Sequence, residues 1–398
     1  MATRGILNAV GVGHSTAADA EAAGHAAVRM ALDSAGLSQA EHLLLFATTH
    51  YGRALPDLLG AARATASART LVGCTGMGVL TSAGELEGGP AVAVMAIDAD
   101  SVFALPYLAR PTAVGEDLAR CIAADLGSRA QEGAVLMALP DIFNLRPVEL
   151  LQRLGEEFKG LPIVGGAAAG EPGSPQTFQW SNDTLSSRGV AGALLGGDLT
   201  VAIGVAQGCT PIGQPYVITD AQSNVILEIA GRPALEVLRA TLQSLGPETL
   251  QRARGSFFAG LVIDERRDFH GRGDFLIRNI IGVDERSGAV TVGEMVRPGQ
   301  TFQLHLRDGQ SAGEDLEMTL AKLAEVTRDR PPTFGLYFNC LGRGAGLYGE
   351  PNHDIEAINQ ALGDVPVVGF FGNAELAPLA GRNLVHNYTG VLALFSLG

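Results

Sequence analysis

Two glycine-rich segments near the C-terminus contain residue types that bind small charged molecules. Each accompanies a short apolar run that predicts a buried strand. The residues of interest at the two strand ends are Asn339, Cys340, Arg343, Gly369, Asn373 and Glu375. Ligands of open α/β sheets bind where the carboxyl ends of neighbouring strands meet. Arg343 facing Glu375 there fits a zwitterion such as an amino acid, whose carboxylate and ammonium groups they would hold. A structural ion pair between Arg343 and Glu375 explains the pattern equally well.

The stretch from Gly344 to Gly349 matches the GxGxxG pattern of dinucleotide-binding loops. In that fold a helix begins within the glycines, whereas Pro351 and its neighbours delay it here. The acidic residue expected at the end of the next strand is also misplaced, because Asp364 precedes that strand. The pattern therefore does not favour nucleotide binding.

The chain has four cysteines, which are far apart and form no CxxC motif: Cys74, Cys121, Cys209 and Cys340. This usage is typical of a reduced, cytoplasmic protein. Cys340, close to Arg343, or Cys74 with Thr75 beside it are the candidate nucleophiles of a hydrolase or transferase acting on an amide or thioester. Small buried hydrophobes at strand ends are the favoured interpretation of both cysteines.

A repeated order of elements predicts the fold. Three segments, 42–97, 134–195 and 334–395, each contain a strand, a helix, a second strand ending in Val-Gly, a glycine-rich loop and a third strand. Strand–helix–strand units favour parallel pairing, and the third strand can pair antiparallel. We therefore expect an α/β protein with mixed sheets flanked by helices and internally repeated units.

The first two repeats offer further ligand sites at their strand ends. The corresponding loops bring Thr49 and His50 towards Cys74 and Thr75 in the first repeat. In the second they bring Asp141 and Asn144 towards Gly166 and Glu171. Residues 199–306 have a different, hairpin-rich pattern. We place a boundary near residue 220, which divides the chain into domains 1–220 and 221–398.

Composition excludes several classes of function. The 398 residues include 28 basic and 42 acidic side chains, a net charge of −14. This balance argues against nucleic acid and anionic membranes as partners. The longest apolar stretch, 189–208, is interrupted by Asp198, and no secretory signal is visible. Lys159 and Lys322 are the only lysines, and neither follows a P-loop. No metal-binding spacing occurs, so we expect no metal and no cofactor.

Several segments resemble known sequences along nearly the whole chain. They are Gly73–Leu80, Glu85–Pro90, Gln207–Gly213, Gly231–Leu235, Gly271–Asn279, Gly299–Asp308, Cys340–Gly349 and Val367–Glu375. Together they resemble the N- and C-terminal domains of FIST (F-box and intracellular signal transduction) proteins. One departure is Ala374, since the family usually has Gly before this Glu.

The resemblance implies a sensory domain that binds small ligands such as amino acids, and it carries over no catalytic residue. Our leading prediction is a small-ligand-binding signal-transduction protein that acts with a signalling protein as partner. The alternatives are the cysteine-dependent enzyme and a protein-interaction scaffold.

Overall fold

Three copies of one strand-and-helix unit make up most of the molecule. The computed structural model describes residues 8–99, 101–112, 116–131, 133–171, 173, 175–253, 256–267 and 269–398. The first copy consists of β1 (Asn8–Ser15), α1 (Ala20–Ala35), β2 (His42–Thr48), α2 (Leu55–Ala66), β3 (Thr70–Gly76), β4 (Gly78–Thr81), β5 (Gly84–Glu87) and β6 (Val92–Ala99). The short 3-10 helix η1 (Thr49–Ala54) lies between β2 and α2.

The other two copies repeat this order. The second has β7 (Val102–Ala109), α3 (Leu118–Leu126), β8 (Val135–Pro140), α4 (Pro147–Glu157), β9 (Ile163–Gly166), β10 (Gln179–Ser181), β11 (Thr184–Ser186) and β12 (Val190–Gly197), with η2 (Gly127–Arg129) after α3. The third has β13 (Leu199–Ala206), α7 (Gly309–Val326), β21 (Phe334–Cys340), α8 (Ala345–Tyr348), α9 (His353–Leu362), β22 (Val367–Gly372), β23 (Glu375–Leu379), β24 (Arg382–His386) and β25 (Gly390–Leu397).

Strand pairing inside the copies confirms the predicted mixed sheets. The two strands joined by a helix are parallel in each copy: β2 with β3, β8 with β9, and β21 with β22. The final strand of each copy then pairs antiparallel with the first of these: β6 with β2, β12 with β8, and β25 with β21. The internal repeat read from the sequence is therefore a repeat of structure as well.

In each copy, one strand of the hairpin also pairs with a strand of a different copy. Strand β4 of the first copy pairs with β22 of the third, β10 of the second pairs with β3 of the first, and β23 of the third pairs with β9 of the second. The exchange closes a ring, so each of the three six-stranded sheets contains strands from two copies. We call this arrangement the hairpin exchange.

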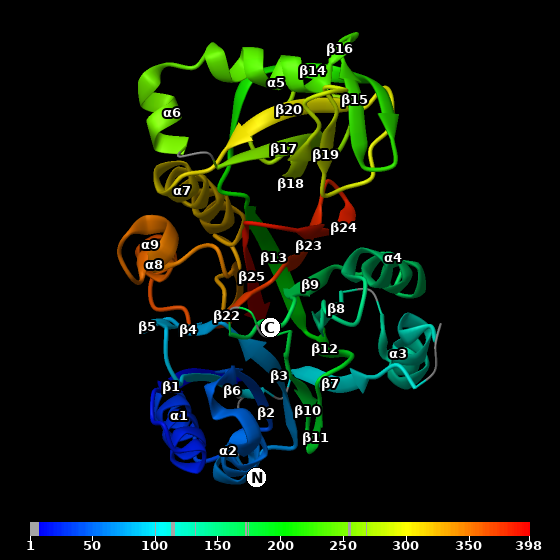
Figure 1. Ribbon diagram of the computed structural model, residues 1–398. Helices are drawn as coiled ribbons and strands as arrows, with labels where there is room; N and C mark the ends of the chain where they lie inside the picture. Colours follow the sequence, from blue (N-terminus) through cyan, green and yellow to red (C-terminus); the bar gives the residue numbers. More distant parts are fainter. Residues whose placement is uncertain are drawn as a thin grey trace.

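The three sheets enclose one apolar core, and the helices cover their outer faces. Side chains such as Phe46, Met137 and Phe338, one from each copy, are buried in the central cluster. Helices α1 and α2, α3 and α4, and α7 and α9 pack on the outside of the three sheets (Figure 1). The helix ends follow ordinary capping chemistry: Asp19 accepts a hydrogen bond from the Ala22 N–H at the start of α1. Among the described helices, none has the length and apolar character needed to cross a bilayer.

The glycine of the repeated Val-Gly pair has one structural role in all three copies. A Cβ added at Gly73, Gly165 or Gly369 would lie 1.7, 1.9 or 1.8 Å from a carbonyl oxygen of the parallel neighbour strand. These distances are far below van der Waals contact, so only glycine fits. The three glycines serve close strand packing at this position.

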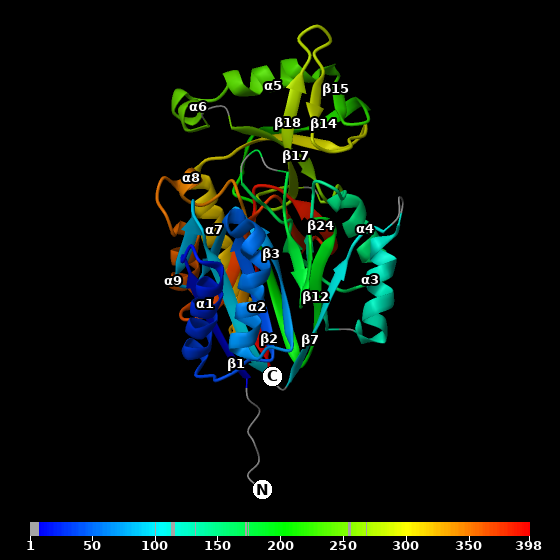
Figure 2. The ribbon, with the colours of Figure 1, turned by 60° about the horizontal axis from the view of Figure 1, so that its bottom comes forward.

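A closed antiparallel barrel is inserted into the third copy, between β13 and α7. Its strands are β14 (Thr210–Gln222), β20 (Thr301–Leu306), β17 (Phe257–Val262), β18 (Phe275–Val283), β19 (Val290–Val292) and β15 (Val225–Ile229), with β16 (Arg232–Pro233) beside β15. Helices α5 (Ala234–Gln243) and α6 (Pro247–Ala253) accompany it. Figure 2 shows the barrel as a layer above the three copies. The predicted boundary near residue 220 lies inside β14, and it stays a prediction.

Candidate functional site

A buried ion pair lies at the carboxyl end of β21. Arg343, in the turn after this strand, donates from Nε to Asp354 Oδ2 at 2.9 Å and from Nη2 to Asp354 Oδ1 at 3.1 Å. Both side chains are fully buried. The partner of Arg343 is therefore Asp354 on α9, and no ion pair joins Arg343 to Glu375 within the described residues.

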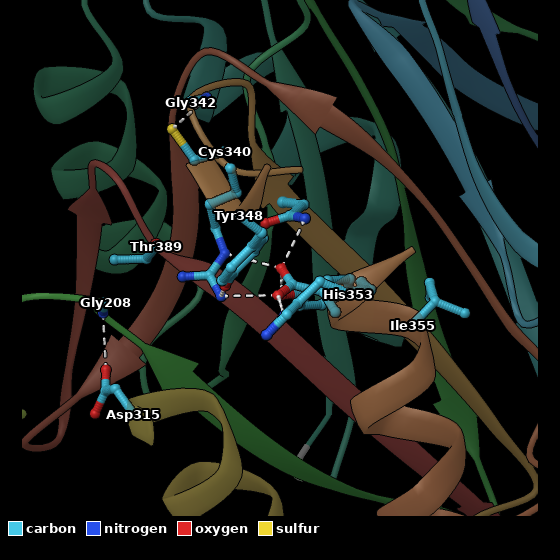
Figure 3. A network of polar contacts seen from close by, with 12 residues as sticks. Gly208, Asp315, Cys340, Gly342, Tyr348, His353, Ile355 and Thr389 are labelled. Atoms are coloured by element: carbon cyan, nitrogen blue, oxygen red, sulfur yellow. Dashed lines mark hydrogen bonds and ion pairs between the residues drawn. The ribbon is translucent and has the colours of Figure 1, made fainter. Parts of the chain in front are cut away.

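Neutral side chains complete the coordination of this ion pair (Figure 3). The Tyr337 hydroxyl and the Asn339 amide donate to Asp354 Oδ2 at 2.8 and 3.1 Å. Arg343 Nη2 also donates to the Tyr348 hydroxyl at 2.5 Å. Burial alone raises the pKa of Asp354, but the Arg343 charge and the hydrogen bonds from His353, Arg343 and Tyr348 together outweigh burial and hold that pKa well below its usual range. Asp354 is therefore ionised in the folded protein.

Asp354 was not among the predicted residues, although the sequence carries a signal for it. It lies on the buried face of α9 with Ile355 and Ile358. A charged residue on the apolar face of a helix is almost always paired. That pattern points to a buried partner without saying which one.

The hairpin exchange brings two glutamates of the first copy to the same place. Glu85 Oε1 accepts from the Ile355 N–H at 3.3 Å, and Glu87 Oε1 accepts from the Ala345 N–H at 3.0 Å. Burial, reinforced by the charge of Asp354, raises the pKa of Glu85 to about 7. The network therefore depends on residues some 270 positions apart in sequence.

Glu375 lies at the start of β23, close enough to Arg343 for the guanidinium charge to act on it. Its Oε2 accepts hydrogen bonds from the Thr389 N–H at 3.2 Å and the Thr389 hydroxyl at 2.6 Å. Burial raises the pKa of Glu375 to about 8 despite these donors and the nearby positive charge. Glu375 is therefore mostly a neutral acid at pH 7. The preceding Ala374 does not have a positive φ, so replacing the usual glycine introduces no strain there.

Five buried polar atoms around this network have no hydrogen-bond partner among the described residues. They are Asn339 Oδ1, Arg343 Nη1, Glu375 Oε1, Glu85 Oε2 and Arg307 Nε. Arg307 is otherwise held by a hydrogen bond from Nη2 to the Gly342 carbonyl at 2.8 Å and by the Tyr388 ring 5.1 Å away. A buried polar atom without a partner is costly, so each such atom requires an explanation. The two arginine nitrogens are donors and Asn339 Oδ1 is an acceptor, and the carboxyl oxygens of Glu375 and Glu85 are acceptors once these groups lose their protons.

The remaining predicted residues are distributed over two places. Thr75 and Asn373 bind residues of the second copy: the Thr75 hydroxyl accepts from the Phe178 N–H at 3.0 Å, and the Asn373 amide donates to the Ala168 carbonyl at 2.7 Å. Glu171, also of the second copy, lies 3.2 Å from His50.

Glu171 therefore contacts His50 of the first copy rather than Asp141 and Asn144, which were predicted to lie close to it. Asn339, Cys340, Arg343 and Glu375 do lie together. Gly166 pairs with Glu375 between strands, and Gly369 lies inside β22.

The cysteines do not have the environment of thiolate nucleophiles. Burial raises the pKa of Cys340 to about 12, and the nearby Glu375 adds to this effect. Burial also raises the pKa of Cys209 to about 12 and that of Cys74 well above its ordinary value. A reactive thiol needs a lowered pKa, so these values disfavour the cysteine-enzyme alternative. No cluster of three or more potential metal ligands occurs in the described part of the chain.

Comparison with known proteins identifies the family. The FIST N domain matches residues 41–232, and the FIST C domain matches residues 234–378. The chain belongs to the FIST family. The resemblance read from the sequence is thereby confirmed. FIST domains are sensory domains of signal transduction that are suggested to bind small ligands.

The similar proteins come from bacteria and from animals. An uncharacterised protein of Mycobacterium tuberculosis is 36% identical over 97% of this chain and 99% of its own length. A second uncharacterised protein, from Mycobacterium bovis, is 34% identical over 97% of this chain and 98% of its own length. Human F-box only protein 22 is 26% identical over 30% of this chain and 34% of its own length.

Proposed function

We propose that this FIST protein is a cytoplasmic sensor that binds a zwitterionic metabolite, an amino acid or a close relative, at the carboxyl end of β21. The observation that carries the proposal is that four of the five unpartnered buried atoms around the Arg343 and Asp354 ion pair belong to Arg343, Arg307, Asn339 and Glu375. The two arginine nitrogens and the two oxygens match the two ends of a zwitterion. A signalling protein that recognises the bound state would then transmit the output.

Each end of the ligand would have its own partners. Arg343 uses Nε and Nη2 on Asp354, so it offers one further donor, Nη1, to a carboxylate. Arg307 Nε supplies a second donor. A carboxylate would thus be shared between two arginines, whereas the sequence led us to expect Arg343 alone to hold it. Asn339 Oδ1 and Glu375 Oε1 are the acceptors for the ammonium group.

The other two copies support a specialised role for the third. The carbonyl that faces the glycine of the repeated Val-Gly pair belongs to Leu45, Ala138 and Tyr337 in the three copies. Two residues further along are Ala47, Pro140 and Asn339. The first and second copies are apolar at both positions, so the repeated framework itself does not require the polar side chains of the third.

Calorimetry and thermal-shift measurements with the free amino acids and related metabolites test the proposal. We expect at least one ligand to raise the melting temperature and to bind saturably, because a ligand that binds only the folded state stabilises it. The Glu375→Gln substitution should weaken binding of that ligand by about tenfold, since a neutral amide replaces the carboxylate that would face the ammonium group. Exposed Glu285→Gln serves as the matched control and should bind as the wild type does.

Proton release gives a second, independent readout. An ammonium group beside Glu375, whose pKa is about 8, favours the carboxylate and displaces its proton. Calorimetry at pH 7 in phosphate and in Tris should therefore report release of about one proton per ligand. Absence of any binder from a broad metabolite collection, with folded protein, would contradict the proposal.

A further inference from the structure

A cavity of about 570 Å³ lies at the carboxyl end of β2, in the first copy. Its volume is within the range of small-molecule sites. The residues that line it are Thr49, Gly52, Arg53, Pro56, Glu171, Gln176, Phe178 and Leu185. The cavity occupies the same place in the first copy that the Arg343 network occupies in the third, namely the end of the first helix-linked strand.

Two different copies build the walls of this cavity. Helix η1 follows β2 directly and is interrupted at Gly52, whose φ of +50° departs from helical geometry. A Cβ at Gly52 would meet no atom within 4 Å, so the chain is open to the surroundings at this point. The opposite wall comes from the second copy through the hairpin exchange. Glu171 of that wall pairs with His50 of η1 at 3.2 Å and so joins the two sides.

Only some of the polar groups that line the cavity have a partner within the protein. Glu171 has a partner in His50, 3.2 Å away, whereas the exposed Arg53 side chain makes no hydrogen bond or ion pair with the described residues. The Thr49 hydroxyl is a buried polar atom, also without a partner in the described chain. One free positive charge and one free hydroxyl therefore lie along the same cavity.

Apart from Gly52 and Gln176, the rest of the lining is apolar. Pro56, Phe178 and Leu185 provide a ring, an aromatic face and an aliphatic chain. Burying an apolar group of a ligand against this surface stabilises the complex. An unpaired guanidinium beside it favours an anionic group, because Arg binds carboxylates with paired hydrogen bonds.

We propose that this cavity is a second ligand site, separate from the one at β21, and that it takes a small organic anion with an apolar body. The carboxylate lies on Arg53, the Thr49 hydroxyl adds a hydrogen bond, and the apolar body contacts Phe178 and Leu185. The site is formed only when the first and second copies are joined, because each supplies one wall.

Binding of 3-phenylpropionate to the full chain tests this site. Trp180 is the single tryptophan, and it pairs with Leu185 of the cavity wall, so its fluorescence reports binding directly. We expect saturable binding of the acid. The uncharged 3-phenylpropan-1-ol should bind about tenfold more weakly or worse, because it lacks the charge that Arg53 recognises.

Variants separate this site from the one at β21. Arg53→Gln should weaken the binding of 3-phenylpropionate by about tenfold. Arg29→Gln, which changes an exposed arginine on α1, and Glu375→Gln should leave the affinity unchanged. Far-UV circular dichroism verifies that each variant is folded. No saturation up to about 10 mM, equal affinity of Arg53→Gln and wild type, or loss of binding in Glu375→Gln would each overturn the proposal.

Discussion

The Glu375→Gln substitution should make the protein less sensitive to rising pH. Glu375 has a pKa of about 8 in the folded protein and an ordinary value of 4.5 when unfolded. Between these values the folded state binds more protons than the unfolded state, so the free energy of unfolding falls as pH rises. At about 1.4 kcal/mol per pH unit, the loss is roughly 3 kcal/mol at pH 7 and, because Glu375 is then half ionised in the folded state, roughly 4 kcal/mol at pH 8.

Glutamine removes this loss while keeping the local hydrogen bonds. Its amide oxygen accepts from the Thr389 N–H and hydroxyl as the carboxyl oxygen does. Near pH 4.5 and below, the variant and the wild type should have similar stability, and by pH 8 the variant should be more stable by several kcal/mol. Glu85, with a pKa of about 7, gives both proteins the same further pH dependence. The difference between the two proteins therefore isolates Glu375.

Urea unfolding at pH 5, 7 and 8, followed by Trp180 fluorescence, measures this difference. Trp180 is fully buried, so its emission changes when the protein unfolds. The Glu285→Gln control, at an exposed position, should follow the wild type at each pH. If the stability difference between wild type and Glu375→Gln were the same at pH 5 and pH 8, Glu375 would not be a neutral buried acid and our account of the site would be refuted.

Three further predictions concern packing, the ion pair and the thiols. Gly73→Ala should lower the free energy of unfolding by several kcal/mol or prevent folding, as judged by urea unfolding, because its Cβ would overlap a carbonyl oxygen; Gly346→Ala, in open space, should be tolerated. Asp354→Asn should lower the free energy of unfolding in urea by about 3–5 kcal/mol, since it leaves a buried guanidinium without its counter-charge. In a thiol-labelling time course at pH 8 on native protein, half-buried Cys121 should react first, and buried Cys340, with a pKa of about 12, only after unfolding. Early labelling of Cys340 would contradict its burial.

The repeated framework was predictable because its signals are local. Apolar runs of strand length, amphipathic helices and the recurring Val-Gly pair lie within some sixty residues of each other in every copy. The parallel and antiparallel pairings followed from the connections alone. Strands β1 and β7 were not predicted. In β1, small and polar residues lie at half-buried edge positions and no continuous apolar run occurs. β7 is an apolar edge strand that contains Pro106, a residue that weakens a strand prediction.

The contents of the candidate site were only partly predictable, because they depend on contacts between copies. Asn339, Cys340, Arg343 and Glu375 were found together since they follow adjacent strands. Glu85 could not be predicted, because it belongs to a hairpin that pairs with a strand about 290 residues later. No spacing rule within a repeat shows which copy receives its hairpin.

The hairpin exchange also has a consequence for how the chain folds during synthesis. When the ribosome has made the first copy, β4 can pair only with β5, since β22 is still to be translated. The other hydrogen-bonding edge of β4 stays uncovered until the last tenth of the chain emerges. Pairing over such a distance slows folding, and an uncovered strand edge favours aggregation. A chain released before residue 367 therefore lacks the strand that closes the ring and is a natural target for chaperones and proteases.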